Sequence, residues 1–287
     1  MKIFAILALT CTLAVSGTLS AAGARAAPPA EAVGMVLDVR GGGEVSGGGA
    51  PARLRLLGYV KPGDRITLAA DAKASVSHYG AKLIYQLTGP LVADVDLAKI
   101  KVRKGGREPV IRSVAEKLVA AALDPQMSAA AVRMRRFDDI EMLAPAKRGV
   151  LLTTRPEFRW EADGDNNYQV SVDELPEREL ARGTTTDKRW QLPAGVALEH
   201  GKSYRWTVAY TAAGGAPASA SAVFGVASAA DSAGMLALRP EPGAGIEEWV
   251  MYATILDERR MHDDAGAAWT IIGAQRPDLA AARATPH

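Results

Sequence analysis

Alternating apolar and polar positions dominate the stretch from residue 32 to residue 104. The alternation is clearest at Met35, Leu37 and Val39, with polar or surface positions between them. A period of two places one face of each strand in a core and the other in water. We expect strands near residues 33–40, 52–57, 65–69, 73–78, 82–87 and 99–103. The pattern therefore predicts a small all-β domain over residues 32–104.

The period changes between residues 108 and 142. Ile111, Val114 and Leu118 recur at helical spacing, and Pro109 suits a first helical turn. A second helical run is expected from about Ser128, a suitable N-cap, to residue 136. We predict a helical connector over residues 108–142.

A second β unit is predicted over residues 145–226. Phe158 and Trp160 are in phase on one strand, and Tyr204 and Trp206 are in phase on another. Several short strands separated by turn residues favour a β-sandwich. We expect these aromatic residues to form its core rather than a platform for sugars. The small residues and prolines of 227–245 then predict a linker.

The last part of the chain, residues 246–279, has helical spacing. Trp249 and Tyr252 fall on a first predicted helix, Ala265 and Trp269 fall on a second, and Pro277 is expected to end it. The spacing resembles the tetratricopeptide pattern of large and small apolar residues. A single unit of that kind cannot bury both faces alone, so the hairpin should pack on its own β domain, on another copy or on a partner. Trp249, Tyr252 and Trp269 are therefore candidate partner-binding residues.

These patterns together predict a multidomain, mainly β fold. Its expected order is a small β domain, a helical connector, an immunoglobulin- or fibronectin-like sandwich and a C-terminal α-hairpin.

The N-terminus has the pattern of a secretory signal over residues 1–26. Lys2 precedes an apolar run, and small residues lead to a cleavage site after Ala26. The apolar run is too short to span a bilayer. We expect a soluble periplasmic product that begins at Ala27 and has no membrane span after cleavage. The one cysteine, Cys11, lies within the signal, so the mature chain is expected to have no disulfide.

Charge narrows the choice of partners. The formal net charge is +2, and removal of Lys2 and Arg25 with the signal leaves a balanced chain, which argues against nucleic acid. One segment is locally basic, with Glu108 as its acidic neighbour. Its cations are Lys99, Lys101, Arg103, Lys104 and Arg107. We interpret them first as a solvated strand face, with a patch for anionic envelope polymer or lipid headgroups as the alternative.

Three motifs mark the first β unit: Gly34-Met35-Val36 at its start, Gly63-Asp64 before a strand, and the turn Tyr79-Gly80. In these motifs the unit resembles the FecR-type periplasmic domain. It implies a β-structured unit that binds protein or envelope material outside the cytoplasm. The chain lacks the cytoplasmic tail and membrane span of the regulator of that name, so transmembrane control of transcription is not implied. In the second unit, residues 155–160 and 201–206 are similar to the aromatic strands of fibronectin type III modules.

We find no catalytic motif in the sequence and predict no catalytic residue, metal or cofactor. Glycan-cleaving carboxylate pairs have no fixed spacing, so the absence of a motif leaves an enzyme open. His78 is in phase with apolar strand positions and is expected in a core. His262, with Asp263 and Asp264, is expected in a polar turn, with a metal site as the alternative.

The leading functional hypothesis is a non-enzymatic periplasmic adaptor or scaffold of the cell envelope, which binds envelope proteins or self-associates through its β modules and C-terminal hairpin. The alternative is a peptidoglycan- or carbohydrate-binding module, and a weaker alternative is an envelope hydrolase.

Overall fold

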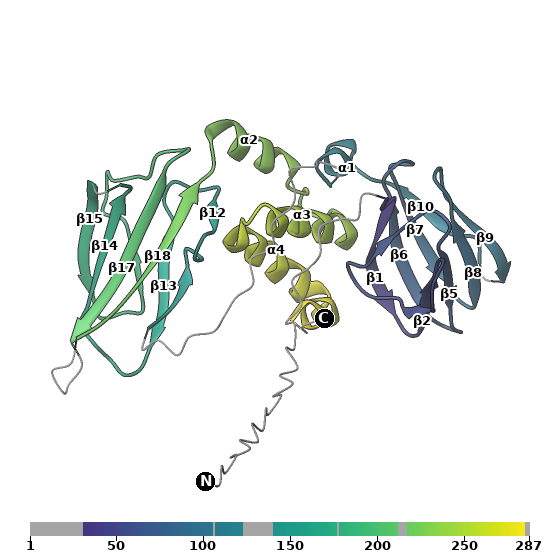
Figure 1. The fold of residues 1–287 in the computed structure, drawn as a ribbon, viewed down its shortest axis with the longest axis horizontal. Coiled ribbons are helices and arrows are strands. Elements are labelled where there is room, and N and C mark those ends of the chain that lie inside the picture. Colours follow the sequence, from purple (N-terminus) through teal and green to yellow (C-terminus); the bar gives the residue numbers. More distant parts are fainter. Residues whose placement is uncertain (1–30, 106, 123–139, 177, 212–216, 285–287) are drawn as a thin grey trace, which may run out of the picture.

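The chain is a mainly β protein with a helical region between two β units (Figure 1). The computed structural model describes residues 31–105, 107–122, 140–176, 178–211 and 217–284. The expected signal peptide and the expected helix over residues 128–136 lie outside these ranges. Strands β1–β10 form what we call the first sandwich, and strands β11–β18 form the second.

The first sandwich consists of two five-stranded antiparallel sheets. One sheet has the order β10 (Val110–Ser113), β7 (Leu83–Thr88), β6 (Lys73–His78), β1 (Gly34–Arg40) and β4 (Tyr59–Val60). The other has the order β3 (Ala52–Arg53), β2 (Gly43–Ser46), β5 (Arg65–Leu68), β8 (Leu91–Val95) and β9 (Ile100–Gly105). Gly34 starts β1 beside β6, where a Cβ would lie 2.0 Å from the carbonyl oxygen of Ser77. That approach requires glycine.

The sheet that contains β1 and β6 is buried on both faces. Val36 and Val76 point into the core between the two sheets, whereas Met35 and Leu37 join a cluster with the helices. Every residue of β6 after Lys73 is buried, including Ser75, Ser77 and His78. A sheet covered on both faces shows a continuous buried run instead of alternation.

The second sandwich packs two sheets around aromatic side chains. One sheet has the order β11 (Ile140–Ala144), β13 (Glu157–Ala162) and β16 (Arg189–Gln191). The other has the order β12 (Val150–Leu151), β18 (Pro217–Val226), β17 (Ser203–Thr211), β14 (Tyr168–Glu174) and β15 (Arg178–Thr185), and β12 pairs with β18 in parallel. Phe158, Trp160, Tyr168, Tyr204 and Trp206 are all buried in this core, which confirms the sequence prediction.

The helices form a layer between the sandwiches, which we call the helical layer (Figure 1). Its members are α1 (Glu116–Ala122), α2 (Ala229–Leu238), α3 (Ile246–Glu258), α4 (His262–Gln275) and α5 (Pro277–Ala284). Helices α3 and α4 form the predicted hairpin, and their inner faces meet at Leu256, Ala265 and Ile272, each fully buried. Pro277 does end the hairpin, but it also begins α5, because proline suits the first turn of a helix.

Two predictions about the connecting segments are wrong. Residues 108–142 are not wholly helical, because Val110–Ser113 pairs with β7 as a strand and Ile140–Ala144 begins the second sandwich. Residues 227–245 are not a linker throughout, because α2 occupies Ala229–Leu238. Ser228 caps that helix by accepting the backbone N–H of Asp231, and alanine has the strongest helix propensity.

Candidate functional site

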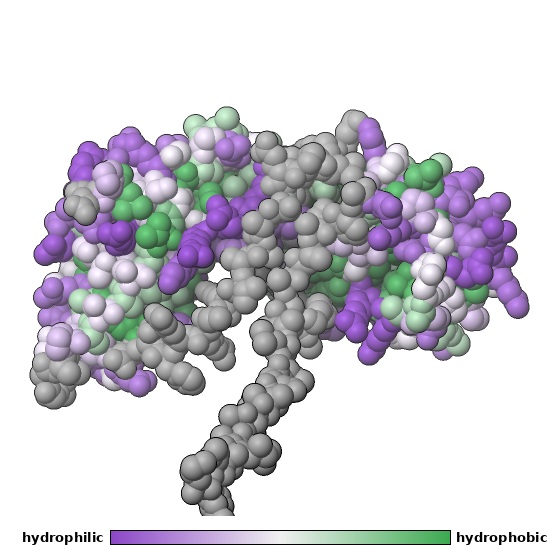
Figure 2. All heavy atoms as spheres, in the orientation of Figure 1, coloured by the Kyte–Doolittle hydropathy of each residue, from purple (hydrophilic) through white to green (hydrophobic). Residues whose placement is uncertain are grey.

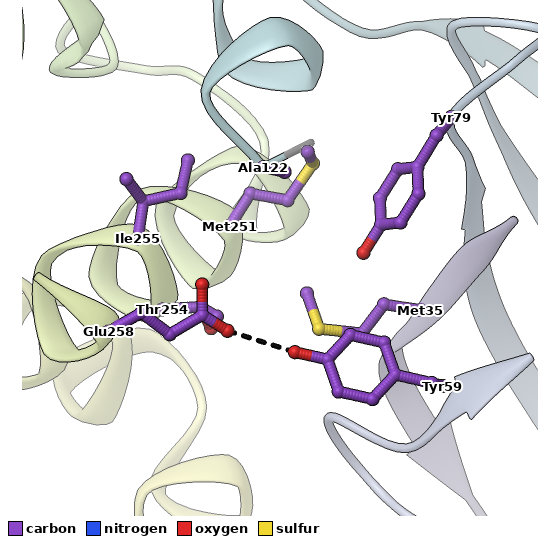
Figure 3. Close-up of a pocket in the computed structure, with 8 residues that line it drawn as sticks. All are labelled: Met35, Tyr59, Tyr79, Ala122, Met251, Thr254, Ile255 and Glu258. Atoms are coloured by element: carbon purple, nitrogen blue, oxygen red, sulfur yellow. Dashed lines mark hydrogen bonds between the residues drawn. The ribbon is translucent and has the colours of Figure 1, made fainter. Parts of the chain in front are cut away.

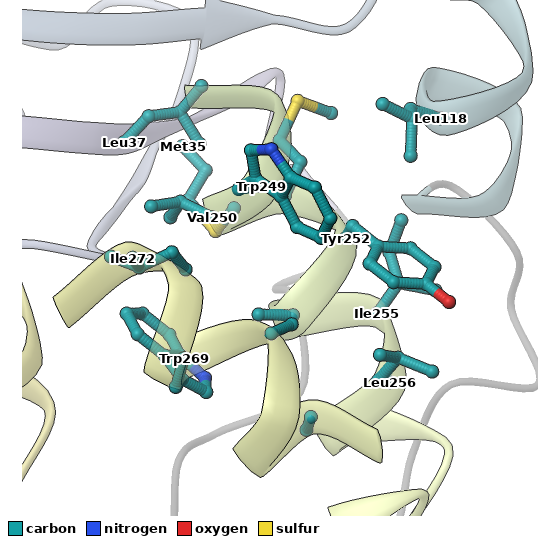
Figure 4. Packing of buried hydrophobic residues seen from close by; sticks show 14 of the residues in the cluster. Met35, Leu37, Leu118, Trp249, Val250, Tyr252, Ile255, Leu256, Trp269 and Ile272 are labelled. Atoms are coloured by element: carbon teal, nitrogen blue, oxygen red, sulfur yellow. The ribbon is translucent and has the colours of Figure 1, made fainter. Parts of the chain in front are cut away.

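The three aromatic residues expected to bind a partner are buried inside the chain. Trp249, Tyr252 and Trp269 are 6%, 4% and 4% exposed, within the cluster that joins the helices to the first sandwich (Figure 4). The indole N–H of Trp269 donates to Asp257, 3.2 Å away. Burial raises the pKa of the Tyr252 phenol. The prediction that these three residues bind a partner is therefore wrong. The hairpin packs them against the first sandwich, so none of them is available for docking.

The junction of the helical layer with the first sandwich combines apolar packing with buried polar contacts. Glu247, at the start of α3, is 6% exposed and accepts hydrogen bonds from Ser75 Oγ at 3.1 Å and Gln86 Nε2 at 2.8 Å. Tyr59 donates its hydroxyl to Glu258 at 2.9 Å (Figure 3). These contacts fix α3 across the outer face of the sheet.

A bidentate ion pair stabilises the same junction where the end of α4 meets β1. Arg276, between α4 and α5, donates to both carboxylate oxygens of Asp38 at 2.5 and 2.7 Å. It also donates to Asp278, and these two carboxylates raise the pKa of Arg276 further above its usual value. In turn, Arg276 lowers the pKa of Asp278.

The junction of the helical layer with the second sandwich depends on hydrogen bonds from backbone N–H groups to carboxylates of α4. Asp263 accepts the N–H of Ala146 at 3.1 Å, and Asp264 accepts the N–H of Leu152 at 3.3 Å. Burial raises the pKa of Asp264, and the nearby charge of Asp263 acts in the same direction. The prediction of a polar turn at His262 is wrong, because His262, Asp263 and Asp264 form the first turn of α4. Their two carboxylates fasten α4 to the backbone on either side of β12.

The basic segment divides into two parts in the structure. Lys99, Lys101 and Arg107 line a groove of about 300 Å³ where the edge strands β9 and β10 of the two sheets approach each other. Arg103 instead pairs with Asp94, at 2.5 Å, and Lys104 is exposed outside the lining. We call this feature the basic groove; its lining residues are Tyr85, Lys99, Ile100, Lys101, Val102, Gly105, Arg107, Glu108, Pro109 and Ile111.

The basic groove has an apolar floor and one exposed apolar wall. Tyr85 and Ile100 are each 4% exposed, whereas Ile111 on β10 is 52% exposed. Figure 2 shows hydrophilic surface gathered over the end of the first sandwich where β8 and β9 lie. Sequence reasoning missed the groove because it placed Ile111 on a helix; the signal for a strand was the adjacent β-branched pair Val110 and Ile111.

A second, smaller cavity lies between the first sandwich and α3. It has about 10 Å³ of free space, about enough for one water molecule, and Met35, Tyr59 and Glu258 are among its lining residues (Figure 3). The hydroxyl of Thr254, which also lines it, is buried without a hydrogen-bond partner. We interpret the cavity as an imperfection of packing at the junction.

Each histidine of the described chain lies beside a polar partner. His78 is fully buried, as predicted; its Nδ1 accepts the N–H of Ala81, so its Nε2–H donates to the carbonyl oxygen of Asp96 at 2.8 Å. His262 lies 3.4 Å from Asp257. Within the described ranges, three or more His, Cys, Asp or Glu side chains do not converge as a metal site would require.

Comparisons with known proteins give no family. No family model matches the chain, and no curated protein matches it. Among solved structures, it is similar to the crystal structure of CopC from Methylosinus trichosporium OB3b, at 12% identity, with 31% of this chain and 95% of that chain covered and a TM-score of 0.25. A TM-score of 0.25 supports no assignment of fold or function.

Over the residues that the structure describes, each helix is too short or too polar to cross a bilayer.

Proposed function

We propose that the protein is a non-enzymatic adaptor of the cell envelope that holds two β-sandwich modules at a fixed separation. The observation that carries the proposal is that both sandwiches are fastened to the same helical layer. Glu247 and Arg276 tie it to the first sandwich, and Asp263 and Asp264 tie it to the second. A rigid spacer of this kind suits a protein that positions two partners.

Location in the envelope rests on the sequence of residues 1–26. A charged start, an apolar run and a small-residue cleavage site are typical of an exported chain. The mature protein is expected to begin at Ala27 in the periplasmic fraction. The resemblance of the first sandwich to FecR-type domains is consistent with a binding role there.

The carbohydrate-binding alternative loses its aromatic support. A sugar platform needs aromatic faces open to solvent, whereas Trp160, Tyr204 and Trp206 are each 1% exposed or less. The basic groove adds no exposed ring, because its aromatic residue, Tyr85, lies in the floor.

Photo-crosslinking at two positions tests the adaptor proposal. A photoreactive residue at Lys101 would report on the basic groove, and one at Ser221, exposed on β18, would report on the second sandwich. We expect each position to give a discrete adduct in intact cells, with different proteins identified by mass spectrometry and confirmed by direct binding of the purified components. The same two variants without ultraviolet irradiation are the negative control. Absence of adducts at both exposed positions would contradict the proposal.

A further inference from the structure

The basic groove gathers three exposed cations. Lys99, Lys101 and Arg107 are exposed, and none has an ion pair within the part of the chain that the structure describes. By contrast, Arg65 and Arg103 share the carboxylate of Asp94. Of the lining residues only Glu108 is acidic, so the groove has a net positive charge.

The groove also combines this charge with apolar surface. Val102 is half-buried beside the cations, and Ile111 is 52% exposed on the facing strand. An occupant that satisfies both must therefore carry negative charge and apolar groups together. A polyphosphate or an anionic sugar polymer would use only the cations.

The strands that flank the groove favour an extended peptide. β9 and β10 are the edge strands of their sheets, and an edge strand has outward backbone N–H and C=O groups that can pair with an added strand. Lys99 and Lys101 are two positions apart, and carboxylates at alternate positions of an extended chain repeat at about the same 7 Å spacing. Lysines on such an edge also repel basic segments, so they select for acidic ones.

We propose that the basic groove binds an extended acidic segment of a partner protein, in which acidic side chains alternate with apolar ones. The carboxylates pair with Lys99, Lys101 and Arg107, and the apolar side chains contact Val102 and Ile111. This inference rests on the adaptor function, for which it names the chemistry of one partner.

Fluorescence anisotropy with a defined probe tests the proposal. The probe is a labelled ten-residue peptide of alternating Glu and Val, added to the full mature chain. We expect saturable binding that weakens as salt rises from about 50 to about 300 mM, because the ion pairs are exposed. The variant Lys99→Glu/Lys101→Glu/Arg107→Glu should weaken binding by about ten-fold or more.

A matched variant separates the groove from overall charge. Arg53→Glu/Arg55→Glu/Lys73→Glu makes the same charge change at exposed positions away from the groove lining, and it should change binding by less than about two-fold. Circular dichroism and thermal melting check that all variants fold. If the glutamate variant does not fold, the milder Lys99→Gln/Lys101→Gln/Arg107→Gln set is used, with weakening still expected.

Three results would overturn the inference. These are no binding of the Glu-Val peptide, equal loss in the groove and control variants, and displacement of the peptide by heparin or polyphosphate at lower concentration than by unlabelled peptide. The last result would assign the groove to an anionic polymer. Discrete protein adducts from Lys101 without peptide binding would leave the adaptor function intact and reject only this choice of occupant.

Discussion

The two junctions of the helical layer are built in different ways. The first sandwich presents a whole sheet face, and Met35, Leu37 and Ile84 enter one continuous core with α3 and α4. The second sandwich contributes chiefly Leu152 and Ala227 to that core and is otherwise held by hydrogen bonds to the acidic start of α4. Packing of a sheet face removes a large apolar area from water. The free energy gained from that burial exceeds the net stabilisation from a few hydrogen bonds.

This difference implies an order of strength. The helical layer and the first sandwich should unfold together, whereas the second sandwich should separate from them and keep its own aromatic core. Substitutions in the first junction should therefore lower stability more than substitutions in the second.

Substitution of Trp249 by alanine should give the largest effect. The indole is 6% exposed at the centre of the first junction, and truncation of a buried tryptophan costs about 3–5 kcal/mol. Hydrogen exchange should accelerate in α3, α4 and β1 while β14 and β17 keep their protection. Leu236→Ala, at a position 54% exposed on α2, is the control and should be nearly neutral. Uniform acceleration in both sandwiches would show that the two junctions form one cooperative unit.

Removal of the Glu247 carboxylate should have an intermediate effect. Glu247→Ala leaves Ser75 Oγ and Gln86 Nε2 without their acceptor in a buried site, which costs about 2 kcal/mol. Glu247→Gln keeps an acceptor oxygen, so its free energy of unfolding should fall by less. That smaller loss comes mainly from removing the favourable negative charge at the start of α3. Denaturant unfolding of the three proteins measures this order. Equal losses for alanine and glutamine would mean that the charge, and not the hydrogen bonds, stabilises the first junction.

The smallest effect is expected at Asp264 in the second junction, and it depends on pH. Burial raises the pKa of Asp264 in the folded chain above its unfolded value, so the ionised carboxylate destabilises the fold. This penalty is complete above the folded pKa and disappears as the pH falls toward the unfolded value, about 3.9. Asp264→Asn keeps an acceptor for Leu152 and removes the charge.

Urea unfolding at two pH values checks that sign. The Asn variant should be more stable than the unchanged chain by less than about 1 kcal/mol near pH 8, with the gain lost near pH 4. Asp165→Asn, at an exposed loop position, should show no such pH-dependent gain. A constant difference across the range would mean that Asp264 is not destabilising when ionised.

The elements that the sequence predicted best are strands with one face in a core and the other in solvent. Alternation located Phe158 with Trp160 and Tyr204 with Trp206, because one face of each strand meets the aromatic core and the other meets solvent. In β6 the alternation of apolar and polar positions fails, because it places Ser75 in water although that residue is buried. Helix α3 covers that face of β6. Its Glu247, far away in the sequence, accepts a hydrogen bond from the buried Ser75 hydroxyl.

The candidate site was predicted only in part. The cations Lys99, Lys101 and Arg107 are visible in the sequence, but their assembly into a groove depends on β10 pairing with β7. Ile111 fits a helical spacing with Leu118 equally well, and only that long-range pairing makes it a strand residue. Likewise, Trp249 has the spacing of a repeat unit, but no local pattern states which sheet covers it.

The sheet buried on both faces also has a consequence for biosynthesis. Its strands β1 and β6 are made first, whereas their cover on α3 and the Arg276 clamp on Asp38 come from the last part of the chain. The nascent first sandwich therefore exposes Met35, Leu37 and Ile84 until the helices that cover them have been synthesised. A chain that terminates before α3 would keep this apolar face open to proteases and chaperones.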